Sequence, residues 1–237
     1  MKTVVITGGS RGIGRACAFK FAREGFCVVF TYRKSESAAK EVLEKITESG
    51  GLAYAFSCDA GISSEVESLR GFMASNALSA DVLINNAGVA DYSLFQDMTD
   101  GQWTEIRKTL DGAVYCTRAF LPDMLKKHEG AVVNVSSVWG ISGASCEAAY
   151  SAAKAGIIGL TRALAKEVAP SGVRVNCIAP GCVDTDMCAK LDKKMLSDMI
   201  PLGRVAQPEE IADAVYFLAT ASYVTGEVLS IDGGFGR

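Results

Sequence analysis

The 237-residue chain contains a single histidine, His128, within the segment Lys126-Lys127-His128-Glu129-Gly130. Such a segment is typical of the solvated end of a helix, so histidine-dependent catalysis is not expected. Eight cysteines are present, but none forms a Cys-x-x-Cys pair, and most fall in apolar strand or helix segments. A free thiol in that setting behaves as a small hydrophobic group. We therefore expect neither disulfides nor a metal site.

Long apolar runs and blocks of one charge sign are also missing. The first apolar run, 3–6, turns into glycines and is too short for a signal peptide or a membrane-spanning helix, so we expect a cytoplasmic protein. A formal net charge of -3 gives no general attraction for nucleic acid or an anionic membrane. No Pro/Ser-rich or highly charged stretch divides the chain, so residues 1–237 are predicted to form one domain.

Short apolar runs do alternate regularly with longer amphipathic segments. Strands are expected at 3–6, 27–32, 53–57, 82–84, 131–136, 173–178 and 228–231, and helices after Gly12 and over 36–48, 64–75, 102–127, 148–168 and 208–219. This alternation requires crossover connections, and therefore a parallel sheet covered by helices on both faces. Ligands in such an architecture bind at the carboxyl ends of the strands.

A glycine-rich turn, 7–14, follows the first expected strand. Gly8, Gly12 and Gly14 let the backbone turn sharply and direct free N–H groups at a pyrophosphate. The spacing Gly-x-x-x-Gly-x-Gly departs from the commoner Gly-x-Gly-x-x-Gly, and alone it is equally consistent with an ordinary turn. The strand before it and the amphipathic helix after it favour a dinucleotide site.

The end of the second expected strand indicates which dinucleotide is used. An acidic residue there holds the ribose 2′-hydroxyl of NAD, whereas a basic one accommodates the 2′-phosphate of NADP. This chain has Arg33 and Lys34 and no acid, and Arg11 adds a cation nearby. We predict NADP(H), the alternative being that these are solvated loop charges.

Tyr150 and Lys154 are four residues apart on an expected helix, so their side chains share one face. A lysine cation at ~5 Å is expected to lower the phenol pKa by about two units, which makes Tyr150 a better acid near neutral pH. Ser137, at the end of the strand 131–136, can donate a hydrogen bond to the same substrate oxygen. Tyr-x-x-x-Lys alone also describes many surface pairs; together with Ser137 and the glycine turn it predicts a hydride-transfer site.

On these motifs the chain resembles the short-chain dehydrogenase/reductase family over essentially its whole length. The resemblance implies adenine contact by Asp59, cofactor contacts from the segment 85–88, and contacts to the nicotinamide end from the segment 180–185. The predicted cofactor-binding residues are Gly8, Ser10, Arg11, Gly12, Ile13, Gly14, Arg33, Asp59, Asn86, Ala87, Gly88, Tyr150, Lys154, Pro180, Gly181, Val183 and Thr185, and the predicted catalytic residues are Ser137, Tyr150 and Lys154.

The resemblance also implies an architecture and an assembly. It is a Rossmann-type, doubly wound parallel sheet of seven strands in the order 3-2-1-4-5-6-7. Family members are usually homotetramers, and we expect the helices around 102–127 and 148–168 to pack against their copies.

Within the family, the segments 150–156, 175–181, 201–204 and 224–227 are most similar to bacterial 3-oxoacyl-[acyl-carrier-protein] reductases of fatty-acid synthesis. This similarity implies NADPH-dependent reduction of a 3-oxoacyl thioester to the 3-hydroxyacyl form. Two alternatives remain open: a reductase or dehydrogenase of another ketone or alcohol (steroid, sugar or polyol), and a non-catalytic dinucleotide-binding protein.

The chain departs from the family pattern in the long helix. The family usually has an asparagine there, in a stretch like Asn-Leu-x-Gly-x-Phe, which holds a water that relays protons to the lysine. We place Leu110 at the asparagine's position, with the polar Asp111 one residue further along. A leucine cannot hold that water, so we expect an impaired relay that Leu110→Asn would improve.

Two features weaken the carrier-protein assignment. Family reductases dock the acidic carrier protein on arginines that flank the mouth of the active site. The corresponding residues here are His128 and Ser171, which leaves Lys126 and Lys127 nearby, so electrostatic steering is expected to be weaker. Glu147 is expected either to place a negative charge near the pocket or to serve only as a helix-start residue, like its neighbour Cys146.

Overall fold

In a computed structural model that describes residues 1–188 and 192–236, seven parallel strands form one sheet in the order β3-β2-β1-β4-β5-β6-β7. The strands are β1 (Thr3–Ile6), β2 (Cys27–Tyr32), β3 (Ala53–Ser57), β4 (Val82–Asn85), β5 (Gly130–Val135), β6 (Val173–Pro180) and β7 (Val228–Ile231). The predicted strand order and doubly wound architecture are confirmed. β6 continues past the expected end at 178, because 179 and 180 still pair with β7.

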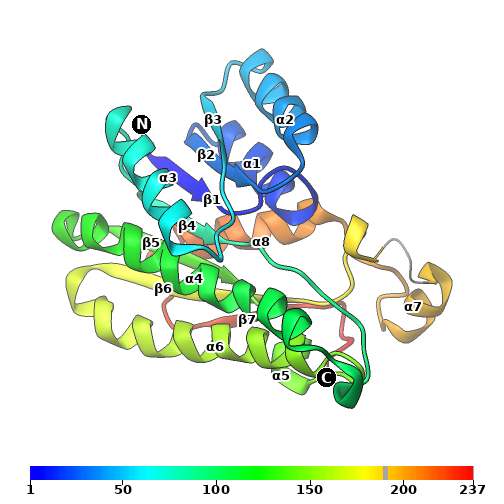
Figure 1. Cartoon of the computed structure of the whole chain (residues 1–237). Helices are drawn as coiled ribbons and strands as arrows, with labels where there is room; N and C mark the ends of the chain where they lie inside the picture. Colours follow the sequence, from blue (N-terminus) through cyan, green and yellow to red (C-terminus); the bar gives the residue numbers. More distant parts are fainter. Residues whose placement is uncertain (189–191, 237) are drawn as a thin grey trace.

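Helices connect the strands (Figure 1). They are α1 (Gly12–Arg23), α2 (Glu36–Glu48), α3 (Ser63–Ser75), α4 (Asp100–Lys127), α5 (Trp139–Ser142), α6 (Ala148–Val168), α7 (Lys193–Met199) and α8 (Pro208–Thr220), with short 3-10 turns η1 (Phe95–Asp97), η2 (Ala169–Ser171) and η3 (Asp186–Cys188). The expected helices are all present. The short helices α5 and α7 were not predicted from the sequence.

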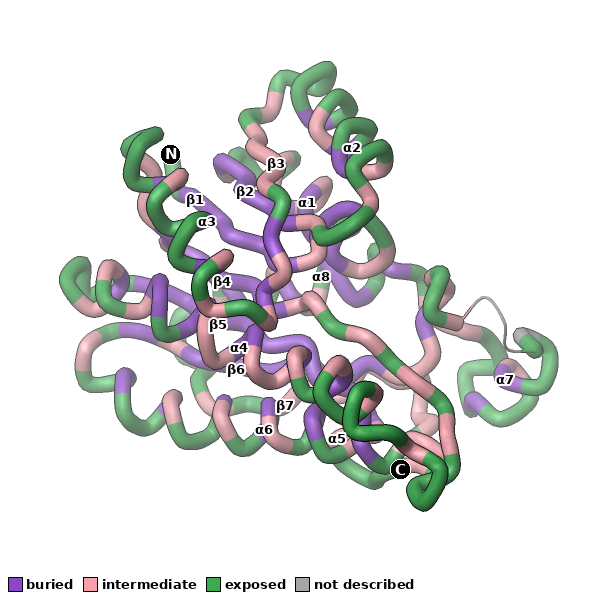
Figure 2. The backbone as a smooth tube through the Cα atoms, in the orientation of Figure 1, coloured by how far each residue is buried: buried purple, intermediate pink, exposed green. Residues whose placement is uncertain are grey.

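Apolar side chains of the strands point alternately to the two faces of the sheet. Val4 and Ile6 of β1 belong to the apolar cluster beneath α1, α2 and α8, whereas Val5 belongs to the cluster beneath α3, α4 and α6. Both faces are therefore covered, as a parallel sheet with crossover helices requires. Figure 2 shows the result: buried residues concentrate along the strands, and the outer surfaces of the helices are exposed.

Helix α4 is the longest helix, and both of its ends agree with local sequence. At its start Thr99 and Gln102 form a reciprocal capping box. His128 caps its end in the left-handed conformation and is exposed, which confirms that this histidine lies at a solvated helix end. All eight cysteines are free thiols. Within 1–188 and 192–236, no helix is both long and apolar enough to cross a membrane.

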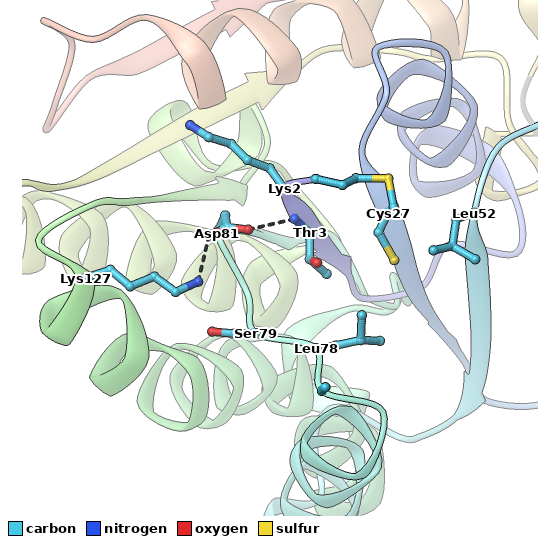
Figure 3. A pocket seen from close by; sticks show the side chains of 10 residues that line it. Lys2, Thr3, Cys27, Leu52, Leu78, Ser79, Asp81 and Lys127 are labelled. Atoms are coloured by element: carbon cyan, nitrogen blue, oxygen red, sulfur yellow. Dashed lines mark hydrogen bonds and ion pairs between the residues drawn. The ribbon is translucent and has the colours of Figure 1, made fainter.

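The amino ends of the strands border a hollow of about 490 Å³, remote from every predicted site residue. Here Asp81 accepts hydrogen bonds from the Thr3 backbone N–H (2.7 Å) and from Lys127 Nζ (2.8 Å) (Figure 3). His128 lies near this edge, since a methyl group on Gly172 would fall 2.3 Å from its carbonyl oxygen. His128 and Ser171 therefore do not flank Tyr150 of the same chain, contrary to expectation, because the whole of α6 separates Tyr150 from Ser171.

Candidate active site

The predicted site residues follow the carboxyl ends of six strands. The glycine turn follows β1, Arg33 follows β2, Asp59 follows β3, Asn86 follows β4, and Ser137 follows β5; Gly181 follows β6. Because all the strands are parallel, these ends meet at one edge of the sheet. Residues spread over most of the chain are thereby collected into one region.

The glycine turn requires glycine at two positions for different reasons. Gly8 has a φ of +69°, which is strained for residues with a Cβ. A methyl group on Gly14 would lie 2.2 Å from the carbonyl oxygen of Gly8, so the start of α1 packs directly on the turn. The N-cap residue of α1, Arg11, makes no capping hydrogen bond with its side chain. The N–H groups in the first turn of α1 are therefore not capped by that side chain. Free N–H groups at the start of a helix are the kind of donors that bind a phosphate.

Three polar side chains hold this turn in place. The Thr7 hydroxyl accepts hydrogen bonds from the backbone N–H groups of Asn86 (3.0 Å) and Ala87 (2.9 Å). The Asn86 amide donates to the carbonyl oxygens of Thr7 (3.0 Å) and Gly8 (3.1 Å), and the Thr31 hydroxyl accepts from Gly8 N–H (3.1 Å). Thr7 and Thr31 were not predicted. Their signal in the sequence is a hydroxyl at the end of an otherwise apolar strand.

The segment after β6 lies against the glycine turn. A methyl group on Gly12 would fall 3.2 Å from Cγ2 of Thr185, and Arg11 forms an ion pair with Asp186 (3.3 Å). On the other side, Pro180 accepts a hydrogen bond from the Val138 N–H (3.0 Å). The remaining predicted contacts in these two segments differ in accessibility: Ser10 and Val183 are buried, whereas Ile13 and Gly181 are half-buried.

Ser137, Tyr150 and Lys154 are brought together and are all buried. Lys154 Nζ lies 5.6 Å from the centre of the Tyr150 ring and donates a hydrogen bond to the Val135 carbonyl (2.8 Å). The Ser137 hydroxyl is close enough to the Tyr150 phenol to lower the pKa of that phenol. The structure thus assembles a phenol, an ammonium group and a hydroxyl at one point.

The effect of this setting on the Tyr150 pKa is opposite to the predicted one. Burial raises the pKa of Tyr150 to about 12, and the Ser137 hydroxyl offsets only part of that rise. Burial also lowers the pKa of Lys154 to about 8. The prediction counted the attraction between ammonium and phenolate but left out the loss of water around both groups, and that loss dominates in the chain by itself.

Glu147 holds both roles that the sequence left open. It is the N-cap residue of α6, and its half-buried carboxylate is close enough to Tyr150 to contribute to the raised pKa of that phenol. Burial also raises the pKa of Glu147 itself. A small hollow beside it is lined by Asp91, by the apolar side chains of Phe95, Met98 and Ile106, and by residues 146–149. The region next to Tyr150 therefore combines apolar surface with carboxylate charge.

The residue of α4 that faces this site is Thr109, not Leu110. A methyl group on Gly88 would lie 3.0 Å from Cγ2 of Thr109 and 3.5 Å from Lys154 Nζ, so both side chains converge on Gly88. Leu110 points instead toward α6, where its Cδ2 would be 2.8 Å from a methyl group on Gly156. Whichever residue corresponds to the family's asparagine, the α4 side chain beside Lys154 is Thr109. Asp111, the other polar candidate, forms an ion pair with Arg107 of the same helix (3.1 Å).

Arg33 and Asp59 lie close together, and two charged residues of α4 join them. Arg33 forms ion pairs with Glu105 of α4 and with Asp59 (3.6 Å), and Lys108 of α4 pairs with Asp59 (3.2 Å) and Glu105 (3.0 Å). Glu105 and Lys108 were not predicted from the sequence, because they are far from Arg33 in the chain and lie within a long amphipathic helix.

The glycine turn at the start of α1 and the buried tyrosine–lysine–serine group place this chain among dinucleotide-binding oxidoreductases. Residues 8–236 match the family model described as "Enoyl-(Acyl carrier protein) reductase". The chain belongs to the short-chain dehydrogenase/reductase family, and it is an oxidoreductase that acts on CH–OH or C=O groups with a nicotinamide dinucleotide.

Several curated relatives are similar over nearly the full length. The 3-oxoacyl-[acyl-carrier-protein] reductase of Synechocystis is 41% identical over 98% of this chain and 96% of its own. The 3-oxoacyl-[acyl-carrier-protein] reductase FabG of Chlamydia trachomatis is 41% identical with the same coverage. A Bacillus subtilis relative, named "Uncharacterized oxidoreductase YmfI", is 39% identical over 99% of this chain and 98% of its own.

Proposed function

We propose that this protein reduces a 3-oxoacyl thioester, carried on acyl carrier protein, to the 3-hydroxyacyl form with NADPH. The observation that supports this most is the convergence of Ser137, Tyr150 and Lys154 in a chain that is 41% identical to reductases named for this substrate. The family model carries a different substrate name, enoyl, but the phenol and hydroxyl suit a carbonyl oxygen, which is the atom that needs a proton in ketone reduction.

The glycine turn fits a dinucleotide. Its close packing against the start of α1 leaves room only for backbone, and backbone N–H groups at a helix start are suited to a pyrophosphate. We assign the turn around Gly8, Gly12 and Gly14 to the pyrophosphate, Arg33 and Asp59 to the adenosine end, and the segment 180–185 to the nicotinamide end. When bound, the dinucleotide supplies the hydride.

The protein's own residues then provide orientation and a proton. The Ser137 hydroxyl and the Tyr150 phenol both hydrogen-bond the substrate carbonyl oxygen. Tyr150 transfers its proton to that oxygen as the carbonyl carbon receives the hydride, so the carbonyl becomes a hydroxyl. Protonated Lys154 stabilises the phenolate that is left.

Tyr150 must then regain its proton, and we assign a part of that task to Thr109. Its hydroxyl is buried, accepts a hydrogen bond from the Val89 N–H (3.3 Å) and lies beside Lys154 across Gly88. A hydroxyl can both accept and donate hydrogen bonds, so Thr109 is suited to hold a water between itself and the ammonium group.

We infer the NADPH preference from the guanidinium groups that lie at this edge of the sheet. Arg33 follows β2, where a 2′-phosphate is read in this architecture, and Arg11 is a second cation at the same edge of the sheet. A free thiol state for all eight cysteines suits a reducing compartment, and we propose a cytoplasmic location on that ground.

A homotetramer is the assembly we propose. Exposed residues of α6 include Ala152, Ala155, Gly159 and Ala163, which lie on one face of the helix. Small side chains allow another helix to approach closely. The exposed Phe217 of α8 and the fully exposed Tyr223 provide a second apolar surface.

The test follows NADPH absorbance with acetoacetyl thioesters of acyl carrier protein and of coenzyme A, alongside cyclic and steroid ketones. We expect turnover of the thioesters and a loss of roughly 100-fold or more in Tyr150→Phe, the size typical for removal of a general acid. Tyr54→Phe is the matched control, since Tyr54 lies on β3 and packs its ring against Phe72 and the apolar core, outside the proposed site.

Each alternative function predicts a different result. Rapid turnover of the cyclic or steroid ketones, with none of the thioesters, would identify another reductase of this family. Cofactor binding without turnover of any compound would identify a non-catalytic dinucleotide-binding protein.

A further inference from the structure

Four charged side chains from three distant parts of the chain meet where the adenosine end of the cofactor is proposed to bind. Arg33 follows β2, Asp59 follows β3, and Glu105 and Lys108 lie on α4. Each cation pairs with both carboxylates. Two positive and two negative charges cancel, so the cluster has no net charge to attract a phosphate.

Arg33 is committed to Glu105 in particular. The Glu105 carboxylate is the largest cause of the raised Arg33 pKa, and Arg33 is in turn the largest cause of the lowered Glu105 pKa. Both changes reflect the same hydrogen-bonded ion pair. A phosphate that binds Arg33 through the same N–H groups must replace this carboxylate.

The two carboxylates of the cluster differ in how firmly they are held. Asp59 is 15% exposed, and its Oδ1 also accepts a hydrogen bond from the Gly61 N–H (3.0 Å). Glu105 is 40% exposed, and the contacts that the structure records for its carboxylate are to the side chains of Arg33 and Lys108. Glu105 is therefore the group free to swing away into water, while Asp59 stays fixed to the backbone.

We propose that Glu105 is a specificity-determining residue that limits the preference of this enzyme for NADPH over NADH. A 2′-phosphate that takes the N–H groups of Arg33 Nη1 displaces Glu105, and the displaced carboxylate keeps Lys108 as its partner. A ribose 2′-hydroxyl needs no such exchange, since it can donate a hydrogen bond to a carboxylate that stays in place. The inference rests on the proposed use of Arg33 for the 2′-phosphate.

The experiment measures dissociation constants of NADPH and NADH, by nicotinamide fluorescence, for the wild-type protein and Glu105→Gln. We expect NADPH binding to tighten about three- to fivefold, the equivalent of one partly exposed ion pair, and NADH binding to change less than that. Adenosine 2′,5′-bisphosphate should tighten as NADPH does, because it keeps the phosphate and lacks the nicotinamide.

Glu129→Gln is the matched control. Its carboxylate pairs with Lys2 (2.6 Å), so the variant also loses one negative charge and one exposed ion pair, but at the amino edge of the sheet. We expect no change in either dissociation constant. Circular dichroism melting curves of both variants establish that they are folded.

The possible failures are distinguishable. Equal binding of NADPH and NADH by the wild-type protein, unchanged in Arg33→Glu, would overturn the proposed NADPH preference. A wild-type preference that Glu105→Gln leaves unaltered would overturn the inference alone. Equal tightening of both dinucleotides would also overturn it, because loss of one negative charge then acts on any anion.

Discussion

At the scale of single residues, burial dominates the behaviour of the proposed catalytic groups. Tyr150 and Lys154 were expected to stabilise each other's charged forms, yet burial raises the pKa of the phenol to about 12 and lowers that of the ammonium group to about 8. Both shifts favour neutral side chains. A site poised in this way would gain most from a nearby positive charge, such as the one that an oxidised nicotinamide would supply.

The buried lysine makes stability depend on pH. The pKa of Lys154 falls from 10.5 to about 8 on folding, so the unfolded chain binds more protons between these pH values and the free energy of unfolding rises with pH there. We expect a rise of about 3 kcal/mol from pH 8 to pH 10.5 in the cofactor-free protein. Tyr150 acts in the opposite direction, but only above pH 10, where its ordinary pKa lies.

Urea unfolding of the wild-type protein and of Lys154→Met, at several pH values between 7 and 10.5, measures this contribution. The difference between the two proteins removes the effect of all other titrating groups. Lys154→Met should be more stable relative to wild type at pH 7 than at pH 10.5. A difference that is constant with pH would show that the Lys154 ammonium group is not destabilised by burial.

At the scale of elements, the register of α4 against α6 decides which side chain enters the site. Thr109 faces Gly88 and Lys154, and Leu110, about 100° further around the helix, fills the space left by Gly156. The helix–helix contact therefore uses leucine as a packing residue. The side chain beside Lys154 is still polar, and the impaired relay stays a prediction for kinetics to test.

Substitutions at these two neighbouring positions should have opposite signatures. We expect Thr109→Val to lower kcat roughly tenfold with KM little changed and to shift the pH profile of kcat, whereas Thr109→Ser should restore activity. Leu110→Asn should destabilise the fold by about 1–3 kcal/mol, because it buries an amide against α6, and should not raise kcat.

Steady-state kinetics across pH, with thermal melting of each variant, test this pair. A faster Leu110→Asn enzyme would support the prediction that Leu110 impairs the proton relay. An unshifted pH profile of kcat in Thr109→Val would contradict a role of Thr109 in the proton relay and leave it only a packing role.

At the scale of the whole molecule, the proposed tetramer brings the end of α6 in one subunit close to the start of α6 in another. Packing of α6 against its own copy across a two-fold axis perpendicular to the helix makes the two helices antiparallel. The end of α6 near Ser171 in one subunit then approaches the start of α6, with Tyr150, in the other. Such an assembly would place the residues near Ser171, which were expected to contact the carrier protein, beside the active site of the neighbouring subunit. Within one chain these residues and Tyr150 lie at opposite ends of α6.

Gly159→Arg tests the assembly without disturbing the fold. Within the chain, a Cβ on Gly159 meets no atom within 4 Å, so the arginine is accommodated by the subunit and obstructs only a neighbouring one. We expect light scattering after size-exclusion chromatography to show a smaller species than the wild-type protein. Gly71→Arg, on α3 and equally open, should leave the mass unchanged. A wild-type monomer, or an unchanged mass in Gly159→Arg, would contradict the proposed α6 interface.

Much of this protein could be predicted from the sequence because its signals are local. The alternation of apolar runs and amphipathic segments predicted the strands and most helices. The glycine turn, Ser137 and the pair Tyr150 and Lys154 could be read directly, since each is specified by a short spacing within one element or at its end.

Contacts between distant segments could not be read in this way. Three features depend on how α4 packs across the carboxyl ends of the strands. They are the burial of Tyr150, the position of Thr109 beside Lys154, and the pairing of Glu105 with Arg33. Glu105 and Arg33 are far apart in the chain, and nothing in either local segment indicates the pair. The sequence alone determined the architecture and the chemical groups at the site; only the tertiary structure decided their neighbours, and neighbours determine the water and charge that set a pKa or a phosphate preference.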